Sequence, residues 1–338
     1  MCSVNKTMDL VCPAGSLPSL KAAVDNGADA VYLGFRDSTN ARNFPGLNFD
    51  LEEMKQALDY AHSKNCRVLL ALNTYPQPEQ WPQWVAAVDN AADIGIDAVI
   101  IADLGLLRYA SRTYPDLRLH LSVQGSCTNR HAIEFYYEEF GIQQVVLPRV
   151  LSLSQVKQVV EHSPVDVEVF GFGSLCIMVE GRCTLSSYVT SESPNTCGVC
   201  SPAKYVRWQE TSQRRRSFLN DVLIDSYASD ETAGYPTLCK GRFMVNEHLY
   251  YAMEEPTSLN TLDILPQLMR MGVAAIKIEG RQRSPAYVAQ VTRVMRTALD
   301  TCHKDPDHYQ VDIECMKTLN KMSEGQTHTL GAFYRSWQ

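Results

Sequence analysis

Several common sequence signals are missing from this chain, and each absence removes a class of protein. No run of about 18 consecutive apolar residues occurs, so no membrane-spanning helix is predicted. The first residues include no long apolar stretch of the kind found in a signal peptide, and we therefore expect a cytoplasmic protein. The net charge is −7, whereas nucleic-acid-binding domains usually present a basic face, so no nucleic-acid partner is expected.

Hydrolase motifs are absent as well. The eight histidines form no His-Glu-x-x-His pair for a catalytic zinc ion, and no Ser-His-Asp order supports a serine protease. Peptidase activity is therefore not expected. His120 alternates with apolar residues in a predicted strand, where packing explains it better than catalysis.

The chain does contain short, β-branched apolar segments separated by stretches with helical spacing. This alternation favours parallel strands joined by right-handed crossovers. Eight strands is the number that closes a (β/α)8 TIM-type barrel, the fold that we predict. An open flavodoxin-like or Rossmann sheet is the alternative. The predicted strands are 10–12, 30–33, 67–72, 98–101, 117–122, 144–147, 165–170 and 274–278.

A long α+β insertion separates the seventh and eighth predicted strands, because residues 171–273 far exceed an ordinary loop. We divide the chain into 8–175 with strands one to seven, 176–256 with an insertion that includes a β-hairpin (205–210 against 216–224), and 257–338 with strand eight and C-terminal helices. Loops that follow barrel strands form the active-site face. Asn73 and Gln124, at the ends of strands three and five, are expected at the same mouth.

Five of the eleven cysteines fall in this insertion, and four of them are the main candidate metal ligands: Cys176, Cys183, Cys200 and Cys239. In a reducing compartment, clustered cysteines favour metal binding over disulfides. Their spacing lacks the two tight Cys-x2-4-Cys pairs of most structural zinc sites, and also the dense cysteine runs of ferredoxins. Cys197 forms a tight pair with Cys200 and is a fifth candidate. An iron–sulfur cluster, a zinc site and a set of unliganded buried cysteines all remain open on spacing alone.

The segment 168–186 resembles the complete signature of the collagenase-like peptidases, family U32. It reads Glu-x-Phe-x2-Gly-Ser-Leu-Cys-x4-Gly-x-Cys-x-Leu-Ser. Segments 234–242 and 277–285 are similar, more narrowly, to the ubiquinone-biosynthesis branch of that family. The resemblance extends over essentially the whole chain from Met8.

This resemblance implies a [4Fe–4S] cluster whose ligands are Cys176, Cys183, Cys200 and Cys239. Cys200 is chosen because the family places this ligand directly before a Ser-Pro pair, and Cys197 is then a departure from the family pattern. The resemblance also implies oxygen-independent ubiquinone synthesis, in which the aromatic ring of the quinone precursor is hydroxylated. The expected partners are a UbiV-like sister protein in a heterodimer and a lipid-carrier accessory protein. Relatives that hydroxylate RNA bases draw the hydroxyl from prephenate, which is therefore a candidate donor here.

Four charged residues at strand ends form the predicted substrate site. Arg149 ends strand six, while Glu279, Arg281 and Arg283 follow strand eight just before a helix. Guanidinium groups beside a helix N-terminus bind carboxylates well, which suits a dicarboxylate such as prephenate. An internal ion pair between Glu279 and an arginine explains these residues equally well.

Three functions from different classes remain. The first is a subunit of an oxygen-independent hydroxylase, which is our prediction. The second is an RNA-base hydroxylase, which the acidic composition disfavours. The third is a peptidase or a zinc-stabilised binding module. A cluster with four cysteine ligands has no vacant protein position, and this favours an electron-transfer or structural role over Lewis-acid catalysis.

Overall fold

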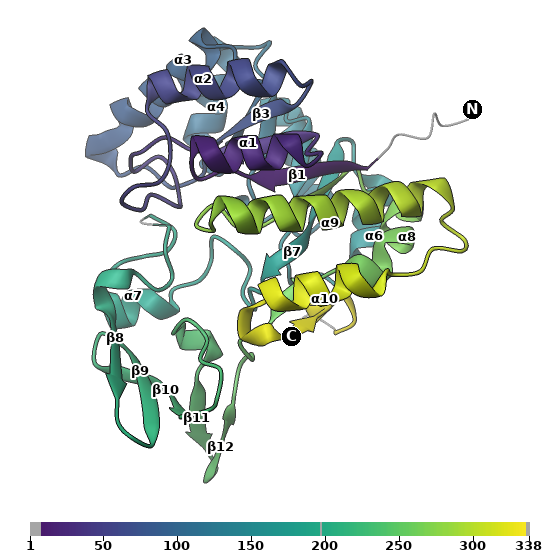
Figure 1. Ribbon diagram of the computed structural model, residues 1–338. Coiled ribbons are helices and arrows are strands. Elements are labelled where there is room, and N and C mark those ends of the chain that lie inside the picture. The colour runs from purple at the N-terminus through teal and green to yellow at the C-terminus, as the bar shows by residue number, and fades with distance from the viewer. Residues whose placement is uncertain (1–7, 197, 336–338) are drawn as a thin grey trace.

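The computed structural model describes residues 8–196 and 198–335. A barrel of eight parallel strands is surrounded by helices, and a lobe of antiparallel strands projects from it (Figure 1). Strand β14 pairs with both β1 and β7, which closes the sheet. The predicted (β/α)8 barrel is confirmed, and the open sheet is excluded. The barrel strands are β1 (Asp9–Pro13), β2 (Ala30–Leu33), β3 (Arg67–Leu72), β4 (Ala98–Ile101), β5 (Leu119–Leu121), β6 (Gln144–Val146), β7 (Asp166–Ser174) and β14 (Ala275–Ile278).

The surrounding helices begin at residues that suit a helix N-terminus. In seven of them a Ser, Asp or Asn side chain accepts a hydrogen bond from a backbone N–H of the first turn, which otherwise has no partner inside the helix. These helices are α1 (Leu17–Asp25), α2 (Leu51–His62), α4 (Leu104–Thr113), α5 (Arg130–Phe140), α6 (Leu153–His162), α9 (Pro285–Lys304) and α10 (Ile313–Met322). Helices α3 (Trp81–Asp93) and α8 (Leu265–Met271) carry a proline in the first turn instead. No helix of the described segments is long and apolar enough to cross a membrane.

The barrel interior is divided between apolar and polar side chains. Inward-facing Val11, Leu69 and Ile100 belong to an apolar cluster of their own. Beside it, Lys277 Nζ donates to Glu168 Oε1 at 2.7 Å, and both side chains are almost fully buried. Paired charges are the form in which a barrel interior tolerates ionised groups. The apolar cluster and this ion pair therefore pack this part of the barrel interior.

The insertion forms the projecting lobe in Figure 1. It contains α7 (Leu185–Thr190), a sheet of β8 (Val206–Glu210), β9 (Arg214–Leu219) and β10 (Val222–Ala228), and a hairpin of β11 (Arg242–Val245) and β12 (His248–Tyr251). The predicted strand 216–224 is wrong as a single element. The chain turns at Asn220 and Asp221, both with positive φ, as a tight two-residue hairpin requires.

Two short strands outside the barrel were not predicted. Strand β13 (Ser258–Asn260) pairs antiparallel with the end of β7 and parallel with β15 (His328–Thr329). Strand β7 is nine residues long, so its last residues extend past the barrel and offer an edge for this pairing. The C-terminal segment is thereby attached to the strand that leads into the insertion.

Candidate functional site

A cavity of about 210 Å³ lies at the mouth of the barrel, where the strand ends meet the insertion. Its lining includes all four cysteines predicted as cluster ligands, together with Arg149, Glu279 and Arg281 from the predicted substrate site. Asn73 and Gln124 also line it. The C-terminal ends of barrel strands and the loops after them normally build such a site.

The four cysteines reach the cavity from separate stretches of chain. Cys176 follows β7 and Cys183 precedes α7, whereas Cys239 belongs to the 3-10 segment Leu238–Lys240. Cys200 lies in the loop between α7 and β8 and is exposed. Within 8–196 and 198–335, no three metal-binding side chains converge on one point. Cys197 lies outside the described residues.

The donor chemistry of this set suits an iron–sulfur cluster. All four side chains are thiols, and soft thiolates select iron–sulfur clusters or zinc over hard cations. Burial raises the pKa of the Cys239 thiol to about 12 and also raises the pKa of Cys176. Such thiols stay protonated near neutral pH until a metal displaces the proton. Four thiols around one cavity therefore fit the implied cluster in number and kind.

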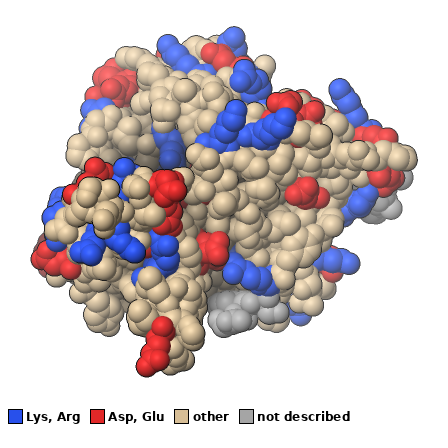
Figure 2. Space-filling model, turned by 60° about the horizontal axis from the view of Figure 1, so that its bottom comes forward, with Lys and Arg blue, Asp and Glu red and all other residues tan. Residues whose placement is uncertain are grey.

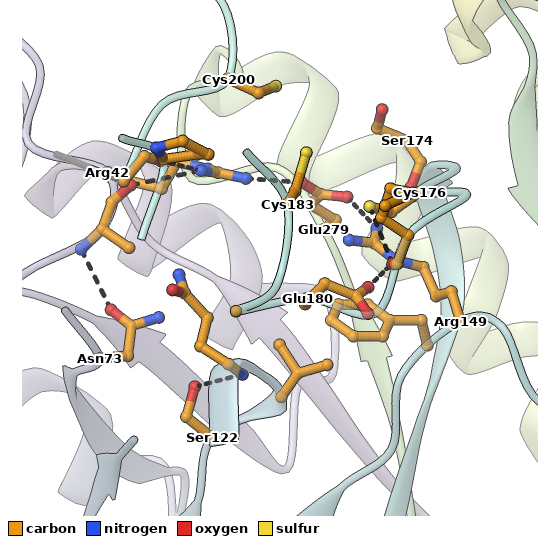
Figure 3. A pocket seen from close by; sticks show the side chains of 18 of the residues that line it. Arg42, Asn73, Ser122, Arg149, Ser174, Cys176, Glu180, Cys183, Cys200 and Glu279 are labelled. Atoms are coloured by element: carbon orange, nitrogen blue, oxygen red, sulfur yellow. Dashed lines mark hydrogen bonds and ion pairs between the residues drawn. The ribbon is translucent and has the colours of Figure 1, made fainter. Parts of the chain in front are cut away.

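A chain of partly buried charges lines the same cavity as the cysteines, and we call it the mouth network: Arg42, Arg149, Glu180 and Glu279. Arg149 Nε donates to Glu180 Oε1 at 2.7 Å, and Arg149 Nη1 donates to Glu279 Oε2. The other Glu279 oxygen accepts from Arg42 Nη2 at 3.3 Å (Figure 3). The Arg149 guanidinium also stacks 4.2 Å from the Phe170 ring centre.

The network fixes the ionisation of Glu279. Burial by itself would raise the pKa of this carboxyl, but Arg149 and Arg42 outweigh it and lower the pKa to about 2. Arg149 and Glu279, both predicted as substrate-binding residues, are thus paired with each other. The partner of Glu279 is not one of the two arginines that follow it in the sequence.

Arg281 is the buried cation of the cavity that has no acidic partner among the residues described. It is 7% exposed and donates to Asn40 Oδ1. Its guanidinium lies 5.5 Å from the Tyr32 ring centre. Burial and the neighbouring Arg42 lower the pKa of Arg281 to about 10, below the usual range for this side chain. Arg283, by contrast, is exposed over the Tyr287 ring and does not line the cavity.

The remaining wall of the cavity is largely apolar. It includes Ile100, Val146 and Phe170, with the Tyr32 ring packed against Lys277 Nζ at 4.1 Å. A cavity that combines apolar walls with a few fixed charged groups is typical of a site for a small organic molecule.

Sequence reasoning missed Arg42 and Glu180. Arg42 lies in an irregular stretch after β2, where no periodicity marks it, and Asn73 Oδ1 holds this stretch by accepting from the Ala41 N–H at 3.1 Å. Glu180 carried a usable signal, because it stands between Cys176 and Cys183 within the segment that we singled out.

Comparison with known proteins gives a consistent set of relatives. The sequence pattern of peptidase family U32 matches residues 15–336. The chain is similar to tRNA hydroxylation protein P1 of Bacillus subtilis, with 29% identity over 96% of this chain and 71% of the relative. It is 32% identical to an uncharacterized protease of Methanocaldococcus jannaschii, over 97% of this chain and 73% of that protein. It is 30% identical to tRNA hydroxylation protein P of Escherichia coli, over 86% and 68%.

Proposed function

This chain belongs to peptidase family U32, and from that premise we propose that it is the cluster-bearing subunit of an oxygen-independent hydroxylase. The observation that carries the proposal is the arrangement of four cysteines around one cavity at the barrel mouth. Two of the relatives named above are hydroxylation proteins, which supports this chemistry over proteolysis. In this proposal Cys176, Cys183, Cys200 and Cys239 hold a [4Fe–4S] cluster, which supplies one-electron chemistry when bound.

We assign the substrate to ubiquinone synthesis rather than to RNA. The segments 234–242 and 277–285 support the ubiquinone-biosynthesis branch, in which UbiU acts with UbiV on the aromatic ring of the quinone precursor. The net charge of −7 supports the same choice. Basic and acidic side chains are interspersed on the face shown in Figure 2, rather than gathered into one basic surface.

The hydroxyl donor in this proposal is a carboxylate such as prephenate, bound at Arg281. A buried guanidinium without an acidic partner is costly, and an incoming carboxylate would offset that cost through two parallel hydrogen bonds. Tyr32 and Phe170 supply the flat and apolar walls that suit a six-membered ring. The chain's own residues would then bind and orient the donor beside the cysteines and limit the access of water.

The test of the cluster is a measurement of iron and acid-labile sulfide after oxygen-free purification with the UbiV-like partner. About four irons and four sulfides per chain are expected in the wild type and in Cys197→Ala, and a large loss of both is expected in Cys200→Ala. One zinc ion and no sulfide in the wild type would refute the redox proposal.

RNA-base hydroxylation is the second candidate, because two of the relatives are named for tRNA hydroxylation. The two candidates separate in a deletion strain grown without oxygen. We expect ubiquinone to fall and its unhydroxylated precursor to accumulate, while hydroxylated nucleosides in tRNA digests stay unchanged. The reverse pattern would assign the protein to RNA.

A further inference from the structure

We propose that Glu279 is the positioning residue that anchors the cysteine-bearing loops to the barrel. The inference rests on the proposed function only in assigning the cysteines to a metal group. The anchoring itself concerns how this chain is held together, and it applies whether the metal is iron or zinc. No cluster atom is needed for the argument.

Glu279 is suited to this task because its backbone is fixed and both its oxygens are engaged. It follows β14 directly, and its N–H donates to the Phe172 carbonyl of β7 at 2.8 Å. The approach of the two strand ends is so close that a Cβ on Gly173 would lie 2.6 Å from the Glu279 Cβ. Each carboxylate oxygen accepts from a different arginine, Arg149 or Arg42. The Glu279 backbone is therefore fixed to β7, and its carboxylate accepts hydrogen bonds from two different arginines.

The first contact leads to the loop of Cys176 and Cys183. Arg149 donates to Glu180, which lies between these two cysteines in the sequence, at 2.7 Å. Its Nη1 also donates to the carbonyl of Ser174, two residues before Cys176. The Arg149 side chain is 9% exposed and that of Glu180 is 10% exposed, so water does not compete strongly for these bonds. Arg149 thus holds this loop at two points, the Ser174 carbonyl before Cys176 and Glu180 after it, and links both points to Glu279.

The second contact leads to the loop of Cys200. Arg42 donates to the carbonyl of Gly198, two residues before Cys200, and to Glu279. At Gly198 φ is +75°, and a Cβ there would lie 2.2 Å from the Ala41 Cα, so the two backbones are in direct contact. Three of the four cysteines are in this way tied to one carboxylate.

The charges explain why Glu279 is the centre of the arrangement. The mouth network contains two guanidinium and two carboxylate groups, and Glu279 is the group that touches both arginines. Without the negative charge of Glu279, Arg42 would lose its carboxylate partner, and Arg149 would keep only Glu180. Buried charges that lose their partner move toward water, and here they would carry the cysteine loops with them.

The test is hydrogen–deuterium exchange on the metal-free protein. The exchange rates of the loop amides report how firmly the loops are held, and they do not depend on thiol ionisation. In Glu279→Gln we expect amide exchange in 176–184 and 198–201 to rise by at least about tenfold, as local opening becomes easier. Glu168→Gln is the matched control, because Glu168 is also a buried carboxylate paired with a cation but contacts no cysteine loop. It should accelerate exchange in β7 and β14 and leave both loops as in the wild type.

Arg42→Lys separates the two contacts and serves if Glu279→Gln does not fold. A lysine keeps the charge but lacks the guanidinium fork that reaches Gly198 and Glu279 together. Exchange should then rise in 198–201 and stay unchanged in 176–184. Equal exchange in Glu279→Gln and wild type, or the same loop acceleration in Glu168→Gln, would overturn the proposal. The exchange experiment uses metal-free protein, so its outcome can be interpreted even if the purified protein contains no iron.

Discussion

At the scale of single residues, Arg281 differs from the other buried cations because no acidic side chain among the described residues pairs with it. Arg42 and Arg149 share Glu279, and Lys277 pairs with Glu168, whereas the buried guanidinium of Arg281 has only an amide oxygen as its hydrogen-bond partner among the described side chains. Proteins retain such unfavourable groups mainly where a ligand completes them. The sequence suggested both Arg281 and Arg283 for this role, and the fold brings only Arg281 into the cavity.

Replacing Arg281 by glutamine should separate ligand binding from stability. A hydrogen bond to a charged group contributes about 1.5–3 kcal/mol, so binding of prephenate should weaken by about 10- to 100-fold. The free energy of unfolding should stay equal or rise, because an uncompensated buried charge is removed. Calorimetric titration and denaturant unfolding measure the two quantities. Arg283→Gln is the control, and its affinity for prephenate should equal that of the wild type. If Arg281→Gln instead lost much stability and no affinity, the role of Arg281 would be structural.

At the scale of elements, the family signature acquires a physical explanation. Gly173 has φ +134° and lies against Glu279, while Gly181 has φ +87° and lies against the Gln124 carbonyl, 2.0 Å from where a Cβ would be. Both positions exclude a side chain for steric and for conformational reasons. The signature therefore encodes the close approach of the cysteine loop to the barrel as well as the thiols themselves.

Gly173→Ala should consequently be far more harmful than an alanine at a glycine with free space. Gly95 also has positive φ, but a Cβ there meets no atom within 4 Å. We expect Gly95→Ala to lower the free energy of unfolding by about 1 kcal/mol, the conformational cost alone. Gly173→Ala should lower it by about 3 kcal/mol or more, since overpacking adds to the conformational cost. Urea denaturation of the metal-free variants tests this, and equal losses would mean that β7 shifts freely.

At the scale of the whole molecule, the alternating strands and helices of the barrel could be predicted from the sequence. Elements and contacts that depend on residues far away in the chain were missed. The barrel strands contain continuous apolar runs such as 68–72, which the local pattern identifies. Strand β13 has three residues and exists because the far end of β7 offers an edge, a relation that no local pattern contains. Arg42 was missed for the same reason, since its partners Gly198 and Glu279 are 156 and 237 residues away. The four cysteines could be singled out from the sequence because thiol chemistry is recognised from residue type and spacing, without the fold.

The barrel interior allows a last prediction, because its central ion pair is separate from the mouth network. Lys277→Met leaves the Glu168 carboxylate buried without its cation and should lower the free energy of unfolding by about 3–5 kcal/mol. Glu168→Gln combined with Lys277→Met removes both charges, and most of that loss should then be recovered. A double-mutant cycle by denaturant unfolding measures this coupling. Additive losses would show that water reaches the pair, and that the interior is less closed than its burial indicates.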